Sequence, residues 1–194
     1  MKDLLVEKQL FTVEEYMNME IHADYKHEFH DGEIITMPGG TINHSKIGLN
    51  VAATLKFRQK GKPCKVFNSD MAIAISDFRY VYPDISAVCG EPEMGLLNKN
   101  AIQNPALIIE VLSEGTASYD SGEKFRKYRG INSLKEYVLI DQESFLVEIY
   151  SKLEDNHWDL RVYNGQNEVI PLKSIDSEIS MEEIYEEIEF EVNN

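Results

Sequence analysis

Asp84 and Glu110 are the two side chains whose positions most clearly suggest chemistry. Asp84 follows a proline and opens the strand-like run "DISAVC", whereas Glu110 lies inside the continuous apolar run "ALIIEVLS". A buried carboxylate is costly unless a charge or hydrogen bonds compensate it. Two carboxylates on adjacent strands, with a backbone carbonyl such as that of Val111, would form a hard oxygen site suited to Mg²⁺. Spacing alone leaves an alternative, in which Glu110 pairs with a lysine or arginine or faces solvent at a strand end.

A cationic side chain could reach these acids from the segment that follows the apolar strand. Residues 118–130 are predicted to form a helix, and Asp120, Lys124 and Tyr128 recur on it every four residues, so they share one face. Asp120 with Glu123 has the spacing of a helix cap. The alternative is that Asp120 and Lys124 form a surface ion pair worth less than about 1 kcal/mol, with Tyr128 in the core.

The rest of the chain alternates strand-like and helix-like patterns, which favours an α/β sandwich with a sheet core and helices on its faces. Helices are predicted to begin at Thr12 and Ser180, each with a capping-box pattern, and to span residues 42–61. Strands are predicted around a turn at Asp31-Gly32, within 64–76 (one or two), 82–89, 104–113 and 135–141, and as an antiparallel pair in 145–151 and 157–166 with a turn at Asn164-Gly165.

The composition suits a single domain covering residues 1–194, since 43% of the residues are hydrophobic. No run of about 18 apolar residues predicts a membrane span, and the N-terminal residues show no secretion signal. Cys64 and Cys89 are too few for a disulfide scaffold, so a reducing cytoplasm is expected, with one disulfide left open. His27 and His30 would point to opposite faces of a strand, so no zinc site is predicted.

The charge of the chain is strongly negative and unevenly distributed. The net charge is −15, which disfavours phosphate-rich partners because sequence-independent affinity for nucleic acids comes from Lys and Arg. The segment 174–194 holds eight acids and no Lys or Arg. Five bases lie within 56–65 and four within 124–129. These bases predict either a basic face on an acidic protein or simply solvated helix surfaces.

Four segments in series resemble the PD-(D/E)XK nuclease superfamily, and the similarity is closest to its Uma-two family, a group of mostly uncharacterised bacterial proteins. The segments are "YKHEFHDGEIITMPGGTINHSKI", "YPDISAVC", "NPALIIEVLSEGTASYDSGEKFRKY" and "SLKEYVLID", and they span most of residues 12–141. The resemblance implies a restriction-endonuclease-like α/β fold, with a mixed central β-sheet flanked by helices and an added antiparallel C-terminal β-hairpin.

The resemblance also implies a role for each matching position. Asp84 and Glu110 match the two acids that ligate the metal and act in catalysis. The superfamily lysine normally lies two residues after the second acid, where this chain has Leu112. In the Uma-two family a lysine of the following helix takes its place. Lys124 matches that lysine, and Lys127 is its rival.

Four residues receive further roles: Glu28, His44, Lys127 and Tyr128. Glu28 matches a family glutamate and would complete the inner or outer shell of the metal as a catalytic residue. His44 matches a family histidine and, with Lys127 and Tyr128, is assigned to substrate binding. Taken alone, a histidine near a helix start is more often structural.

The function that the resemblance implies is metal-dependent hydrolysis of phosphodiester bonds, with Mg²⁺ or Mn²⁺ as cofactor and DNA as the expected substrate. A homodimer is expected by analogy, because cutting two strands needs two sites. The net charge and Leu112 motivate an alternative, a nuclease-like fold that binds nucleic acid or protein without cutting. A third hypothesis is that the acidic segment 174–194 screens the active face.

Overall fold

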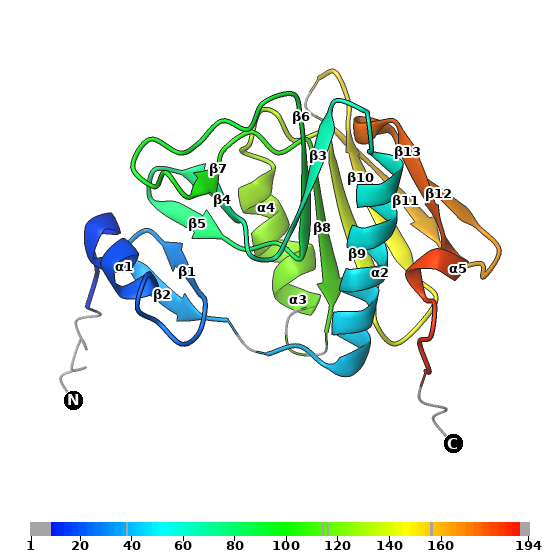
Figure 1. Cartoon of the computed structure of the whole chain (residues 1–194), viewed down its shortest axis with the longest axis horizontal. Coiled ribbons are helices and arrows are strands. Elements are labelled where there is room, and N and C mark those ends of the chain that lie inside the picture. The colour runs from blue at the N-terminus through cyan, green and yellow to red at the C-terminus, as the bar shows by residue number, and fades with distance from the viewer. Residues whose placement is uncertain (1–8, 38, 114, 116, 156, 191–194) are drawn as a thin grey trace, which may run out of the picture.

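The largest element of the fold is a six-stranded mixed sheet (Figure 1). A computed structural model describes residues 9–37, 39–113, 115, 117–155 and 157–190. Strands β8 and β9 pair in parallel and the other neighbours are antiparallel. In spatial order the strands are β11 (Trp158–Tyr163), β10 (Val147–Lys152), β9 (Glu136–Asp141), β8 (Leu107–Leu112), β6 (Ile85–Cys89) and β3 (Cys64–Asn68).

Strand β8 is central because its side chains are apolar on both faces of the sheet. Leu107, Ile109 and Val111 contribute to one core, whereas Ile108 contributes to the core on the opposite face. All four are at most 1% exposed. The sequence prediction of a central strand covered on both sides is therefore confirmed.

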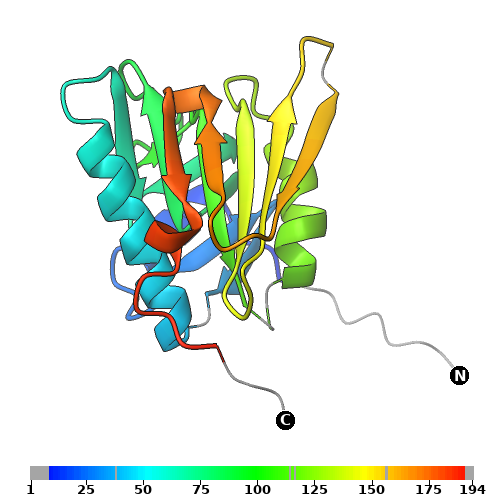
Figure 2. The same cartoon turned by 90° about the vertical axis from the view of Figure 1, so that its right-hand side faces the viewer.

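Each face of this sheet is covered by its own helices (Figure 2). One face packs against α2 (Ile42–Arg58), whose buried residues Ile47, Val51 and Leu55 form the predicted stripe at four-residue spacing. The other face packs against a continuous helical segment that changes its winding along its length. This segment consists of α3 (Ala117–Tyr119), a π-helical stretch (Asp120–Lys124) and α4 (Phe125–Tyr128).

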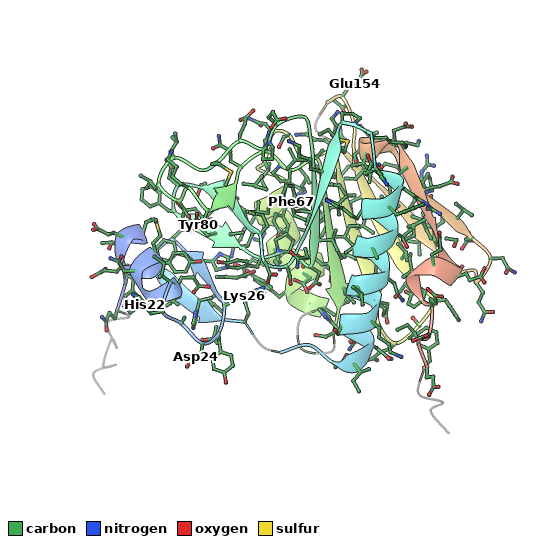
Figure 3. The ribbon with its side chains drawn as sticks, in the orientation of Figure 1. His22, Asp24, Lys26, Phe67, Tyr80 and Glu154 are labelled. Atoms are coloured by element: carbon green, nitrogen blue, oxygen red, sulfur yellow. A yellow bond between two sulfur atoms is a disulfide. The ribbon has the colours of Figure 1, made fainter. Side chains whose placement is uncertain are left out.

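A five-stranded sheet forms the N-terminal part of the molecule, and the helix α1 (Val13–Glu20) packs on it. Tyr16, Phe29 and Tyr80 stack their rings between helix and sheet, with centroids 4.9 to 6.2 Å apart. Figure 3 shows Tyr80 within this part of the molecule. In spatial order the strands are β2 (Glu33–Thr36), β1 (His27–His30), β5 (Arg79–Val81), β4 (Ala72–Ser76) and β7 (Ala101–Ile102).

The acidic C-terminal segment is part of the core and packs on the α2 face of the six-stranded sheet. Its described residues include the end of a 3₁₀ turn (Lys173–Ile175), β13 (Ser177–Ser180) and α5 (Met181–Ile184), and β13 pairs with β12 (Val169–Leu172), which comes just before the segment. Ile179, Met181 and Ile184 are at most 2% exposed and join the same core as α2. The predicted C-terminal hairpin is present as the β12–β13 pair. Removing the segment would therefore open the core. The segment packs on the sheet face opposite to that of Glu110, which bears on the hypothesis that it screens the active face. Glu191, one of its eight acids, is outside the described residues.

Acids of this segment also engage the basic cluster of residues 56–65. Arg58 bonds Glu183 at 2.5 Å and also contacts the carbonyl of Glu178, and Lys62 lies 3.6 Å from Asp176. Two of the five bases in this cluster are therefore paired with acids of the C-terminal segment.

Most predicted elements are present, and two local predictions are wrong. The capping boxes at Thr12 and Ser180 and the Asp31-Gly32 hairpin turn, with φ of 52° and 99°, are confirmed. The turn at Asn164-Gly165 does not join the β10–β11 pair, since residues 153–157 connect those strands and Glu154 lies at the tip of the connection (Figure 3). Asp120 does not cap its helix, because the helix begins at Ala117.

The two cysteines face each other across β3 and β6. Cys64 and Cys89 are register partners and form a disulfide, the outcome that the sequence left open. The cytoplasmic location remains a prediction. None of the helices in the described ranges is long and apolar enough to cross a membrane.

Candidate active site

The pairing of β6 with β8 places the two predicted acids beside each other. Ile85 is the register partner of Ile109 in an antiparallel pair, so Asp84, just before Ile85, lies opposite Glu110, just after Ile109. The backbone N–H of Asp84 donates to Glu110 Oε2 at 3.3 Å, and the N–H of Val111 donates to Asp84 Oδ2 at 2.8 Å. The two carboxyl groups therefore lie at the same end of the sheet and line one cavity.

Lys124 reaches this pair from the π-helical stretch that follows β8. Its Nζ lies 2.8 Å from Glu110 Oε1, and 3.5 Å from both Glu28 Oε1 and Asp120 Oδ1. Lys124 and Asp120 are 5% and 4% exposed, so their pairing is a buried one rather than the surface ion pair considered from the sequence. An ammonium group from the following helix thus lies beside Glu110, although the position two residues after Glu110 is Leu112 and not a lysine.

Glu28 comes to the same cavity from the other sheet. It lies on β1, is 5% exposed, and accepts a hydrogen bond from the backbone N–H of Tyr82 at 3.4 Å. Its Oε2 lies 2.9 Å from Nε2 of His30, and Lys127 Nζ lies 3.2 Å from Nδ1 of the same ring. Since an ammonium group can only donate, Nδ1 accepts, and the neutral ring carries its proton on Nε2 and donates it to Glu28. His30 and Lys127 therefore fix the orientation of Glu28.

His44 stands at the opening of the cavity. It lies in the first turn of α2, which Thr41 caps, and its Nε2 is 3.2 Å from Asp84 Oδ2. Its side chain is 23% exposed. The cavity has a volume of about 180 Å³ and is lined chiefly by the side chains Glu28, Tyr82, Asp84, Glu110, Tyr119, Asp120, Lys124 and His44 and by Gly39 and Gly40.

Burial and charge shift the protonation of these groups in different directions. Burial raises the pKa of Glu110 to about 8, although the Lys124 ammonium opposes this. Burial would also raise the pKa of Glu28, but Lys124 and His30 outweigh it and the pKa is lowered. Burial would lower the pKa of Lys124, yet the surrounding carboxylates raise it well above its usual value. The hydrogen bond to Asp84 raises the pKa of His44.

The donor set fits a divalent metal in its chemistry. Asp84 and Glu110 supply hard carboxylate oxygens to one cavity, which the residue Val111 also lines. Within the described parts of the chain, no group of three or more His, Cys, Asp or Glu side chains is arranged to enclose an ion. An ion held by these two carboxylates would therefore need further ligands, such as a backbone carbonyl and water, to complete its coordination.

Not every predicted site residue lies where a substrate could touch it. Tyr128 is fully buried and donates its hydroxyl hydrogen to Glu110 Oε1 at 3.0 Å, so the structure does not support its predicted substrate contact. Lys127 binds Glu123 and His30 rather than facing the cavity. His30 was not selected from the sequence. Its position two residues after Glu28 on one strand places both side chains on the same face, and this spacing could have identified it.

Comparison with known proteins shows the family to which the chain belongs. A family model described as "Putative restriction endonuclease" and named Uma2 matches residues 13–182. Two proteins of Synechocystis sp. (strain ATCC 27184 / PCC 6803 / Kazusa), both named uncharacterized, are similar to the chain. One is 38% identical over 82% of this chain and 90% of its own length. The other is 34% identical over 91% and 92%.

A solved structure shows that the fold is shared as well. It is described as a putative nuclease belonging to DUF820 from Anabaena variabilis ATCC 29413, and it superposes with a TM-score of 0.73 over 90% of this chain and 97% of that chain, at 17% identity. The restriction-endonuclease-like fold expected from the sequence is therefore confirmed. With most of its length covered by the family model and by both relatives, the chain belongs to the Uma2 family of restriction-endonuclease-like proteins.

Proposed function

We propose that the protein is a nuclease that uses Mg²⁺, or Mn²⁺ in its place, to hydrolyse phosphodiester bonds in DNA. The observation that carries the proposal is the position of Lys124, whose Nζ lies 2.8 Å from Glu110 while Glu110 lies beside Asp84. Two carboxylates and an ammonium group thereby share one cavity, although the lysine comes from a different element than the superfamily pattern prescribes.

Each residue of the proposed site would have its own role in hydrolysis. Asp84, Glu110 and the Val111 carbonyl would hold the metal, which when bound supplies Lewis-acid stabilisation of phosphate charge and lowers the pKa of coordinated water. Lys124 would place positive charge beside the scissile phosphate. Glu28, whose pKa is lowered, is ionised at neutral pH and would accept a proton from the attacking water.

His44 completes the proposed arrangement on the solvent side. Its raised pKa favours the imidazolium form, and its partial exposure lets it meet a phosphate that enters the cavity. There it would donate a hydrogen bond to a phosphate oxygen. The protein would work as a homodimer, since one cavity cuts one strand.

The test is cleavage of supercoiled plasmid by purified protein with Mg²⁺ or Mn²⁺. We expect Asp84→Ala and Lys124→Gln each to reduce cleavage at least about a hundredfold. Lys99→Gln, which changes a lysine on a loop away from the cavity, is the matched control and should cut normally. If cleavage persists unchanged in both site variants, another site or a contaminant is responsible and the proposal is wrong.

A second candidate function is partner binding without cleavage. The observation that favours it is the internal pairing of Arg58 and Lys62 with acids of the C-terminal segment, which leaves less positive surface for a phosphate backbone. Titration calorimetry with Mn²⁺ separates the two functions. Saturable binding that Asp84→Ala abolishes supports the nuclease, whereas its absence favours the binding module.

A further inference from the structure

A second cavity lies at the other end of the six-stranded sheet, on the α2 face. Its volume is about 290 Å³. One wall consists of alternate residues of β10 and β11, which point to the same face of the sheet. Figure 2 shows the β12–β13 hairpin lying beside these outer strands. The lining residues are Lys135, Glu136, Ile149, Ser151, Lys152, Leu153, Asp159, Arg161, Tyr163, Pro171, Lys173 and Ser174.

Four cations meet at this cavity in a protein whose net charge is −15. Lys135 and Lys173 are exposed, and neither ammonium group has a carboxylate within ion-pair distance among the described residues. Arg161 bonds Asp159 at 3.2 Å, and Lys152 reaches the carbonyl of Asn132 at 3.4 Å. By contrast, several other lysines of the chain are paired with acids. Three lysines without a carboxylate partner among the described residues, Lys135, Lys152 and Lys173, therefore line this cavity.

A buried carboxylate builds the floor of the cavity. Glu136 is 3% exposed, and its oxygens accept hydrogen bonds from the backbone N–H of Lys173 at 3.2 Å and of Ser174 at 2.9 Å, and from the Ser174 hydroxyl at 2.6 Å. These bonds hold the 3₁₀ turn against β9. They fix the backbone of Lys173 and Ser174 at the cavity and turn the Glu136 lone pairs away from a ligand.

We propose that this cavity binds a phosphate group, carried by free phosphate or by a nucleotide. Lys135 and Lys173 would supply the direct charge-assisted contacts, and Arg161 would add its planar donors at the rim. Tyr163 and Ile149 form an aromatic and apolar wall, which can contact the organic part of a nucleotide. The two acids at the cavity are already engaged, Glu136 by three donors and Asp159 by Arg161.

The cavity is separate from the proposed active site. Glu136 is the register partner of Leu107, three residues before Glu110 on β8, which is roughly 10 Å along the strand. Glu136 also belongs to the α2 face, whereas Glu110 meets Lys124 on the other face. Binding here does not depend on whether the protein cleaves DNA.

The experiment is a titration of ¹⁵N-labelled full-length protein, followed by backbone amide signals. One arm uses inorganic phosphate and the other uses AMP. We expect saturable shifts at Ser151, Ser174 and their neighbours, and affinity at least about tenfold lower in the Lys135→Gln/Lys173→Gln variant. The control is Lys56→Gln/Lys60→Gln, which removes two exposed lysines of the other basic cluster. Because all four side chains are exposed, the variants should fold.

The two titrations distinguish a phosphate site from a nucleotide site, and both from diffuse attraction by surface charge. Saturation by phosphate supports a site for the free anion, and saturation by AMP alone supports a nucleotide site. If neither ligand saturates, or if both lysine pairs weaken binding equally, the affinity comes from diffuse charge and the proposal is wrong.

Discussion

The role of the buried Lys124 in compensating the acids of the candidate active site can be tested by measuring the free energy of unfolding, before any substrate is known. Lys124 and Glu110 are 6% and 4% exposed in their side chains and 2.8 Å apart. Lys65 and Glu91 are also 2.8 Å apart, but they are 45% and 89% exposed. The two pairs have the same length and differ in burial, so each serves as the reference for the other.

Replacement of each lysine by glutamine should have very different costs. Removing one partner of a buried pair leaves the other charge uncompensated, which costs about 3–5 kcal/mol. Lys124 also lies 3.5 Å from Glu28 and Asp120, so the upper part of this range is expected. Lys65→Gln removes an exposed pair and should cost less than about 1 kcal/mol. In Lys124→Gln/Glu110→Gln, part of the loss should be recovered, because the stranded carboxylate is gone.

The measurement is urea unfolding at pH 9, where Glu110, with its pKa of about 8, is ionised, and it is followed by far-UV circular dichroism and by the fluorescence of Trp158. This residue is the single tryptophan and its ring contacts Phe125 at a centroid distance of 5.3 Å, next in sequence to Lys124. If Lys124→Gln loses no more free energy of unfolding than Lys65→Gln, or if the double variant is less stable than Lys124→Gln, the ammonium does not compensate buried acids and the reasoning is refuted.

Three further predictions concern other parts of the molecule. His30→Phe keeps the ring volume but removes the donor to Glu28, so plasmid cleavage should fall about tenfold or more, and an unchanged rate would exclude an orienting role. The pKa of Glu110 in the folded protein is about 8, above its unfolded value, so its stabilising contribution is fully present below the unfolded pKa and is lost as the pH rises through 8. Glu110→Gln should remove this fall from the curve of unfolding free energy against pH. Parallel curves for the wild type and the variant would contradict the prediction. The disulfide closes a segment with a separation of 25 residues, so Cys64→Ala/Cys89→Ala should lose about 3–4 kcal/mol in urea unfolding. If both cysteines of the unreduced wild type react with a thiol reagent in urea, the thiols are free and this prediction is wrong.

The parts of the fold that the sequence predicts well are those with strong local signals. The Thr12 capping box, the Asp31-Gly32 turn and the apolar run around Ile108 each determine their own element through nearby residues. The two-residue strand β7, whose partner strand β4 lies far earlier in the chain, has no comparable local pattern. The sequence also does not show whether residues 64–76 form one strand or two. They form β3 and β4, which belong to different sheets.

The candidate site was predictable where one element carries the pattern and not where several elements meet. The family resemblance identified Lys124, and spacing placed it on one helix face with Asp120. Neither could show that the packing around this ion pair would exclude water and bury it. Likewise, the sequence predicts the helix face on which Tyr128 lies but not how deeply its side chain is buried. The burial of Tyr128 depends on the packing of Phe125 and Tyr137 near it, which is a tertiary property.

The site residues come from two sheets that are connected by several short stretches of chain, one of which lies at the site itself. Strand β5 belongs to the five-stranded sheet and β6 to the six-stranded sheet, and only Tyr82, Pro83 and Asp84 lie between them. Lys124 contacts Glu28 of the first sheet and Glu110 of the second with a single ammonium group. Any hinge motion that parts the two sheets must therefore break the contact with Glu28, so the cavity cannot open widely without also dismantling its own charge arrangement.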